Sequence, residues 1–331
     1  MRPTWLLSLL LAVAPAAAQE ALPPGDDGIR EMEAVVVSGV LPGPGLWKVH
    51  HGEHTLHILG TVSPLPRRME WRSDEVATVL EQADAVLGPP GVVVGSDIGR
   101  LRGLTLLPSA LRARNNPDGQ TLQEVLPEDV HARWLRVKAQ HVGRDRGIEK
   151  RRPLFAAMEL YDKAISRAGL GGRVISPVVN AALKRRRMKS TPTMLQLTID
   201  NPREALADYR GEALRPEDIE CFSRMLDIVE RDLPRMVVRA NAWATGDIEA
   251  LRALPTSPTE ACLSAWSGSE AARKHGIADV DVRIRERWME VAVEALGAHR
   301  TVFATAPVAE LLRPGGYLSM LEAKGYRIES P

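Results

Sequence analysis

The hydrophobic pattern of the chain changes from strand-like to helical within its first hundred residues. Two β-rich runs, at residues 35–37 and 56–59, are separated by a Pro- and Gly-rich segment at 42–45 and a turn at 51–53. This order predicts a hairpin. Apolar residues then recur at helical spacing after Ser73, which is placed to cap a helix. The short apolar run at 85–87 completes a predicted β-α-β unit.

The middle of the chain is patterned as helices, and the mixed pattern returns at the end. Pro127 and Pro153 each open an amphipathic stretch, as proline does at a first helical position. After residue 280 a helical stripe is followed by a strand at 301–304, a helix at 316–324 and a strand at 326–329. We therefore expect an α/β fold in which two related halves, residues 31–110 and 271–331, share one mixed sheet. Residues 111–270 form a helical insertion between them.

Composition and charge place the chain among ordinary globular proteins. Its 331 residues are 44% hydrophobic, enough for a sizeable core, and 43 Lys and Arg residues nearly balance 42 Asp and Glu residues. Such a balance gives no overall field that would attract nucleic acid. Two basic runs, at 150–152 and 184–187, lie at predicted helix ends without interleaved aromatic residues. They are interpreted as solvated helix ends, the alternative being a patch for a polyanion.

The first 18 residues have the pattern of a secretory signal peptide. Arg2 precedes a short apolar run, and Ala16 and Ala18 are placed for cleavage before Gln19. The apolar run is too short to span a bilayer, and no cysteine follows it to accept a lipid. We expect a periplasmic or secreted protein without a transmembrane anchor, with residues 19–331 as a single domain.

The two cysteines, Cys221 and Cys262, both lie in the expected mature chain. After export they would face an oxidising compartment, which favours a disulfide over the alternative of a catalytic thiol.

Four of the eight histidines cluster in residues 47–66, at positions 50, 51, 54 and 57. Imidazole is a common ligand of zinc and copper. In a hairpin, however, His50 and His51 point to opposite faces and His54 lies beyond the turn, so that surface histidines around a turn are favoured over a metal site. Standard catalytic motifs are absent from the sequence. The glycine cluster at 95–99 has the wrong spacing for a phosphate-binding loop or a nucleophile elbow. It is interpreted as a loop.

The order of several short motifs resembles the TraB/GumN family, whose exported members are similar to the Tiki metalloproteases. The resemblance spans nearly the whole mature chain. Its motifs here are Gly45-Leu46-Trp47-Lys48-Val49 leading to Leu59-Gly60-Thr61, Met69-Glu70-Trp71-Arg72-Ser73, Asp118-Gly119-Gln120-Thr121-Leu122, Arg152-Pro153, Trp243-Ala244-Thr245-Gly246-Asp247, and Arg313-Pro314-Gly315-Gly316 followed by Lys324-Gly325-Tyr326.

The resemblance implies two G-x-x-H motifs, one in each half, and carboxylates at strand ends that together hold a divalent metal. This chain departs from that pattern. Ser63 stands at the first histidine position, and Glu310 stands at the second, with Pro307 in place of the glycine. The expected acidic residue falls on Gly88 or Pro89. The Arg-Asn pair usual before a tryptophan of the last long helix falls on Ile284-Arg285. A serine hydroxyl is a poor ligand for a catalytic transition metal, and glycine and proline side chains offer none.

These departures favour an exported protein of the TraB/GumN type that has lost metal-dependent catalysis. Such a protein would act as a scaffold or bind a peptide, glycan or protein partner. The candidate cleft residues are Ser63, Glu310 and Arg285, with no cofactor. Arg283 and Arg287 could join them, although these two arginines are also spaced to form ion pairs with Glu286 and Glu290 on a helix surface.

The alternative is a peptidase-like hydrolase that holds zinc or manganese with non-standard ligands, chiefly His57 and Glu310. A purely structural role in the envelope is a third possibility. Geometry separates the first two readings, because ligands of one metal must surround a common point. A hydrolase requires at least three of a small set of residues to converge, namely His50, Glu53, His57, Asp97 and Glu310.

Overall fold

The computed structural model describes residues 43–96, 98, 103–253 and 258–331, without the side chains of residues 258–261 and 264. The expected signal peptide, the predicted strand at 35–37 and Asp97 lie outside the described residues. The described residues belong to one compact unit. The fold is α/β, as the sequence predicts.

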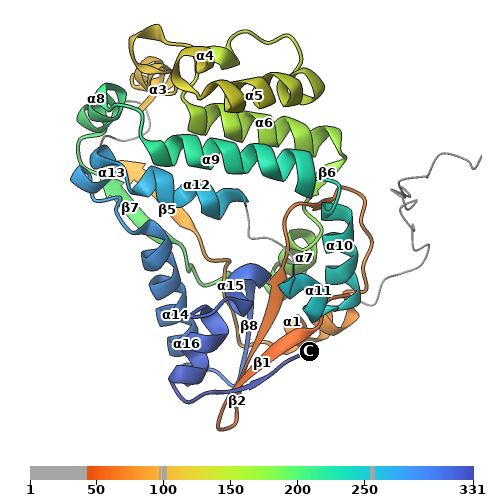
Figure 1. The fold of residues 1–331 in the computed structure, drawn as a ribbon. Coiled ribbons are helices and arrows are strands. Elements are labelled where there is room, and N and C mark those ends of the chain that lie inside the picture. Colours follow the sequence, from red (N-terminus) through yellow and green to blue (C-terminus); the bar gives the residue numbers. More distant parts are fainter. Residues whose placement is uncertain (1–42, 97, 99–102, 254–257) are drawn as a thin grey trace, which may run out of the picture. The chain divides into compact units, whose positions relative to one another are not determined.

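The largest sheet of the described residues is mixed and has five strands, of which β1, β2 and β8 are labelled in Figure 1. Its order is β4-β8-β2-β1-β9. The strands are β1 (Leu46–His51), β2 (His54–Thr61), β4 (Ala85–Val86), β8 (Thr301–Pro307) and β9 (Arg327–Glu329). β1 and β2 form a hairpin around the turn at Gly52. The predicted strand at 56–59 lies in β2, whereas β1 was not predicted. The two chain halves meet where β8 runs parallel to both β2 and β4.

Alternate residues of these strands enter two different cores. Ile58 of β2 and Ala304 of β8 belong to a core on one face, together with Trp288. Leu59 and Phe303, which are the chain neighbours of these two residues, belong to a core on the other face. The sheet is therefore covered by helices on both sides, as expected where parallel strands are buried.

The helices that cover the sheet come from both ends of the chain and also from within residues 111–270, the predicted insertion. On one face lie α1 (Asp74–Gln82) and α7 (Ser176–Arg186). The opposite face is covered by α10 (Met236–Thr245), α11 (Ile248–Arg252), α14 (Val280–Ala298), α15 (Val308–Leu312) and α16 (Tyr317–Ala323). The predicted β-α-β unit at 56–87 is thus present, although Ser73 precedes α1 without a hydrogen bond from its side chain.

The central insertion builds a separate core around Trp134 and Phe222, whose rings lie 5.4 Å apart. In Figure 1 its helices α5, α6, α9 and α12 lie side by side. The insertion consists of α3 (Leu107–Ala113), η1 (Pro117–Gly119), α4 (Leu122–Val125), α5 (Glu128–His141), η2 (Ile148–Lys150), α6 (Pro153–Arg167), α8 (Pro202–Gly211), α9 (Pro216–Asp227), the π-helical turn η3 (Ile228–Asp232), α12 (Pro258–Ser267) and α13 (Glu270–Lys274). A disulfide joins Cys221 of α9 to Cys262 of α12, as predicted.

Two pairs of short strands were not expected from the sequence. β3 (Leu65–Pro66) pairs with β6 (Leu170–Gly172), and β5 (Val92–Ser96) pairs with β7 (Leu195–Ile199). Gly95 and Ser96, interpreted as the start of a loop, lie in β5. The strand run at 195–199 is short and partly exposed, so its hydrophobic pattern gave no clear signal.

The interpretation of the basic runs as solvated helix ends was wrong for two arginines. Arg152 is 3% exposed, and its Nη2 lies 2.8 Å from the carbonyl oxygens of Tyr209 and Glu212 at the end of α8. Arg186 donates to the carbonyl oxygens of Leu80 and Ala83 at the end of α1. Both side chains satisfy carbonyl groups that a helix leaves unpaired at its C-terminus.

Candidate functional site: a cleft at the ends of the parallel strands

The candidate site lies where β2, β4 and β8 end. Ligands of sheets with parallel strands bind outside the carboxyl ends of those strands. At this edge a cavity of about 320 Å³ is lined by Ser63 after β2, by Gly88 and Pro89 after β4, and by Thr305 of β8. A smaller cavity of about 160 Å³ shares Ser63 and also contacts Pro307 and Ala309. We call these two cavities together the strand-end cleft.

The end of β2 is held in place by two buried tryptophans. Trp243 of α10 donates from Nε1 to the carbonyl oxygen of Gly60 over 2.7 Å. A Cβ atom on Gly60 would lie 2.5 Å from the ring of Trp47 and 2.7 Å from Val308. Gly60 is therefore a glycine because the strand passes too close to these side chains for any other residue, and this packing directs the following residues, up to Ser63, into the cleft.

The segment after β4 is positioned by a buried hydroxyl. Thr193, with 0% exposure, donates from Oγ1 toward the carbonyl oxygens of Gly88, at 2.9 Å, and Pro89, at 2.7 Å. The amide of Gly88 donates to the carbonyl oxygen of Thr191. The backbone at the expected acidic position is thus fixed, but its two side chains contribute no polar atom.

Glu310 and Arg285 come together, but apart from Ser63. The closest atoms of these two side chains, Nη1 and Oε2, lie 3.8 Å apart. Arg313 approaches the other oxygen of Glu310 at 3.5 Å. Neither Glu310 nor Arg285 lines either cavity of the strand-end cleft. The three residues predicted to share one cleft therefore divide between two places.

The group around Glu310 is a partly buried ionic cluster between α14, α15 and α16. Arg285 also pairs with Asp281 one turn earlier in α14, at 3.4 Å. Tyr317 of α16 is 1% exposed and stacks on Trp288, with the ring centroids 4.3 Å apart. Burial beside Glu310 raises the pKa of the Tyr317 phenol, so that it stays neutral. These contacts join the last helices of the chain to one another.

The histidine-rich hairpin does not form a metal centre in the described residues. No group of three or more His, Cys, Asp or Glu residues among them could hold a metal ion. His50 lies 3.5 Å from Glu329 at the edge of the sheet, whereas Glu53 is in the exposed turn. Burial, together with the charge of Lys48, lowers the pKa of His57 below its ordinary value.

The other candidate arginines form ordinary surface contacts. Arg287 pairs with Glu290 at 2.6 Å on the surface of α14. Arg283 donates to the carbonyl oxygen of Gly276 over 2.7 Å. Arg283 lines a different cavity, described next, and neither residue lines the strand-end cleft.

That different cavity, of about 470 Å³, lies between the end of β7, the start of α8 and the end of α13. Lys274 on its wall lies 2.9 Å from Glu204 and 2.7 Å from Asp208, and His275 lies 2.7 Å from the same oxygen of Asp208. Sequence inspection missed these residues because they are far apart in the chain and match no motif. Because their charges pair with one another, we interpret these residues as a network that stabilises the fold.

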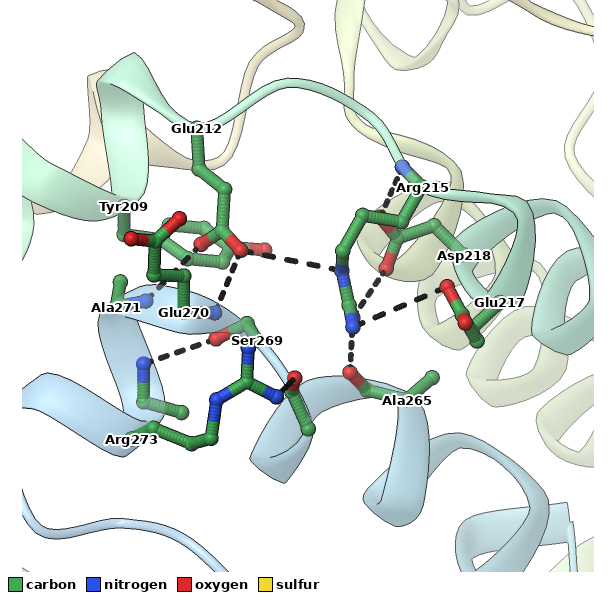
Figure 2. Close-up of polar contacts among 12 residues, drawn as sticks. Tyr209, Glu212, Arg215, Glu217, Asp218, Ala265, Ser269, Glu270, Ala271 and Arg273 are labelled. Atoms are coloured by element: carbon green, nitrogen blue, oxygen red, sulfur yellow. Dashed lines mark hydrogen bonds and ion pairs between the residues drawn. The ribbon is translucent and has the colours of Figure 1, made fainter.

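The network is supported by the loop between α8 and α9 (Figure 2). The Glu212 carboxylate accepts from the amides of Glu270, at 2.8 Å, and Ala271, at 3.4 Å, at the start of α13. Arg215 donates to the carbonyl oxygen of Ala265 in α12 and to Asp218. Figure 2 shows these side chains pointing toward one another across the gap between the helices. They hold α13, and with it Lys274, against α8.

The model of the TraB/PrgY/gumN family matches residues 45–330. The chain belongs to this family. Searches of curated proteins and of solved structures give no match. No helix in the described residues has the length and apolar character needed to cross a membrane.

The residues of this family member do not fit the divalent metal that the resemblance implies. At the strand-end cleft the corresponding positions present a serine hydroxyl, at Ser63, and the side chains of glycine and proline. The one carboxylate, Glu310, faces two guanidinium groups instead of the cleft. A metal requires several donors around one point, and these residues do not supply them.

Proposed function

We propose that this TraB/PrgY/gumN family protein binds a ligand in the strand-end cleft without metal-dependent catalysis. The observation that supports this most directly is the pairing of Glu310 with Arg285 and Arg313. A carboxylate already neutralised by two cations gains little by binding a metal ion, and its departure would break its contacts with both partly buried guanidinium groups. Only Ser63 and backbone groups then remain at the expected ligand positions.

The dimensions and lining of the cleft support a binding role. Its larger cavity of about 320 Å³ falls within the range typical of pockets for small ligands. Apolar walls and a few polar groups at strand ends are the usual composition of such a pocket.

We also propose that the protein works in the periplasm or outside the cell. The Cys221–Cys262 disulfide supports this location, because disulfides persist in oxidising compartments. The pattern of residues 1–18 supports it independently. N-terminal sequencing of the purified mature protein should begin at Gln19, and a mature chain that retains residues 1–18 would contradict cleavage.

Metal content tests the absence of metal-dependent catalysis. The mature protein is incubated with zinc, manganese or cobalt, dialysed, and measured by mass spectrometry for bound metal. We expect no retained metal, in the wild type or in the Glu310→Gln variant. A matched control is Glu329→Gln, which removes a half-exposed carboxylate at the far edge of the sheet.

A near-stoichiometric metal content that is lost in Glu310→Gln and kept in Glu329→Gln would overturn the proposal. It would instead support the alternative, a hydrolase with rearranged ligands.

A further inference from the structure

One stretch of the chain is strongly basic although the chain as a whole is nearly neutral. Residues 163–199 contain eight Lys and Arg residues and no Asp or Glu, whereas the whole chain has 43 basic and 42 acidic residues. The stretch forms the end of α6 and then β6, α7 and β7. A local excess of one sign produces a positive potential even where the net charge is close to zero.

Four exposed arginines gather around β6. Arg167 ends α6, Arg173 follows β6, and Arg67 and Arg68 follow β3, the strand that pairs with β6. A Cβ atom on Gly172 would lie 2.9 Å from the Cα atom of Arg67, so the segments that carry Arg67 and Arg173 are in contact. Among the described residues none of the four arginines forms an ion pair. We call them the β6 arginine cluster.

The guanidinium group of Arg67 is held in a fixed position. Its Nε donates to the carbonyl oxygen of Leu170 over 3.0 Å, and its Nη2 donates to the hydroxyl of Ser166 over 2.8 Å. Both contacts leave Nη1 for a group that approaches from solvent. A side chain that is already ordered loses less conformational entropy when it binds.

The end of α7 supplies a second group of cations. Lys184, Arg187 and Lys189 are exposed, and none of the three forms an ion pair in the part of the chain that the structure describes. Arg185 and Arg186 instead contact the end of α1. These two contacts fix the end of α7, and with it the three exposed cations.

The exposed side of α7 connects the two groups of cations. Small or neutral residues occupy this side, namely Ser176, Pro177, Asn180 and Ala181, and Lys184 follows them. The other side of the helix packs against the core that α7 shares with α1. Since α7 has 11 residues, it is about 16 Å long. The two groups therefore lie about one helix length apart, with no acidic side chain of α7 between them.

The partner that matches this surface is a broad array of phosphate groups. One small anion cannot contact both groups of cations, and guanidinium groups form paired hydrogen bonds with phosphate. Of these cations only Arg173 lines one of the three cavities described above, so the surface is not a groove for a narrow chain. No large hydrophobic side chain in residues 163–190 is exposed, which favours electrostatic contact over insertion into lipid.

From this distribution of charge we propose that the β6 arginine cluster and the end of α7 dock the protein onto a membrane surface rich in anionic phospholipids. The lipid phosphates pair with the exposed guanidinium and ammonium groups, and the protein stays outside the hydrocarbon region. This inference goes beyond the proposed function, because it does not depend on a ligand in the strand-end cleft.

Co-sedimentation of the mature protein with lipid vesicles tests the inference. Vesicles of phosphatidylcholine with about one third phosphatidylglycerol are the probe, and vesicles of phosphatidylcholine alone are the control. We expect binding to the anionic vesicles at about 0.05 M salt and binding at least about tenfold weaker to the neutral vesicles. At about 0.5 M salt binding should be lost, because exposed charges are screened.

Two double variants locate the binding. Arg68→Gln with Arg173→Gln removes two charges from the β6 arginine cluster, and Lys184→Gln with Lys189→Gln removes two from the end of α7. Each pair should weaken binding to the anionic vesicles by about tenfold or more, because one Lys or Arg near an anionic membrane contributes about fivefold.

The matched control is Lys324→Gln with Arg327→Gln, which makes the same change of charge just before and in the edge strand β9. This control should bind the vesicles as the wild type does. All the substituted residues are exposed, so the variants should fold, and circular dichroism checks that they do.

Equal binding to neutral and anionic vesicles, or absence of binding to both, would overturn the inference. An equal loss of binding in the control and in the two double variants would overturn it as well, because net charge would then explain the effect. Long-chain polyphosphate is the soluble probe, and binding to it without binding to vesicles would replace the membrane with a soluble phosphate polymer. Metal content remains the separate test of the proposed function, so that the failure of either is distinguishable.

Discussion

At the scale of single residues, close packing at Gly60 determines where the cleft lies. Replacement by alanine would place Cβ against Trp47 and Val308, both buried and unable to move freely. We expect Gly60→Ala to lower the free energy of unfolding by about 1–3 kcal/mol, as overpacking of a core usually does. Urea denaturation measures the change.

The control for Gly60 is Gly297, near the end of α14, where an added Cβ meets no atom within 4 Å. Gly297→Ala should leave stability unchanged or raise it by up to about 1 kcal/mol, since alanine favours a helix. Equal stability of the Gly60→Ala variant and the wild type would show that β2 can shift away from Trp47.

His57 gives a prediction about pH. Burial, with smaller contributions from Lys48 and His50, lowers its pKa in the folded state below the ordinary value of about 6.5. The unfolded chain therefore takes up a proton first as the pH falls. The stability contributed by the neutral imidazole is complete above about pH 6.5 and is lost as the pH falls toward the pKa of the folded state.

We expect the free energy of unfolding of His57→Gln to depend less on pH than that of the wild type between about pH 7 and 5. Denaturation series at several pH values measure this. Burial also lowers the pKa of His141, at a different place in the fold. His141→Gln should therefore remove a separate part of the pH dependence of the free energy of unfolding. If the free energy of unfolding depended on pH equally in His57→Gln and the wild type, the lowered pKa of His57 would be contradicted.

At the scale of elements, Arg152 joins the start of α6 to the end of α8. It is buried, donates to carbonyl groups of α8, and lies over the Tyr209 ring with its guanidinium carbon 4.7 Å from the ring centroid. Arg152→Met should destabilise the protein by about 2–3 kcal/mol, because hydrogen bonds from a charged donor are lost and the carbonyl groups stay buried. Arg146→Met, at an exposed position, is the control and should cost less than about 0.5 kcal/mol.

The disulfide joins two further elements of the insertion. It links α9 to α12 across a sequence separation of 41 residues. We expect the double variant Cys221→Ala, Cys262→Ala to be less stable by about 2–5 kcal/mol. A reducing agent should lower the stability of the wild type by a similar amount and leave the double variant unchanged, and a response of the double variant would point to an effect unrelated to this bond.

At the scale of the whole molecule, the sheet and the insertion have separate cores within one compact unit. We expect the mature chain to unfold in one cooperative thermal transition, consistent with a single domain. Phe222→Ala in the insertion and Phe303→Ala in the sheet, each costing about 3–5 kcal/mol, should both shift that same transition in calorimetry. Two transitions, each sensitive to one of the variants, would divide the chain into two domains.

The sequence by itself determined the parts of the protein that depend on local chemistry. β-rich runs predicted the strands at 56–59 and 301–304, which lie in β2 and β8, and Pro153 marked the start of α6. The strand β1 was not predicted. The family was recognisable because motifs such as Trp243-Ala244-Thr245-Gly246-Asp247 follow one another in a fixed order, and the disulfide followed from there being only two cysteines. The expectation that Ser63 stands at the first histidine position came from the same resemblance.

Only the tertiary structure decided which of these residues meet. Glu310 and Ser63 both follow parallel strands, yet Glu310 lies beside Arg285 and Arg313 and does not line the cleft, whereas Ser63 does. The pairing of β5 with β7 and the burial of Arg152 likewise depend on contacts between distant segments. Such contacts form only when the packed elements exclude water, so no local pattern of residues could predict them.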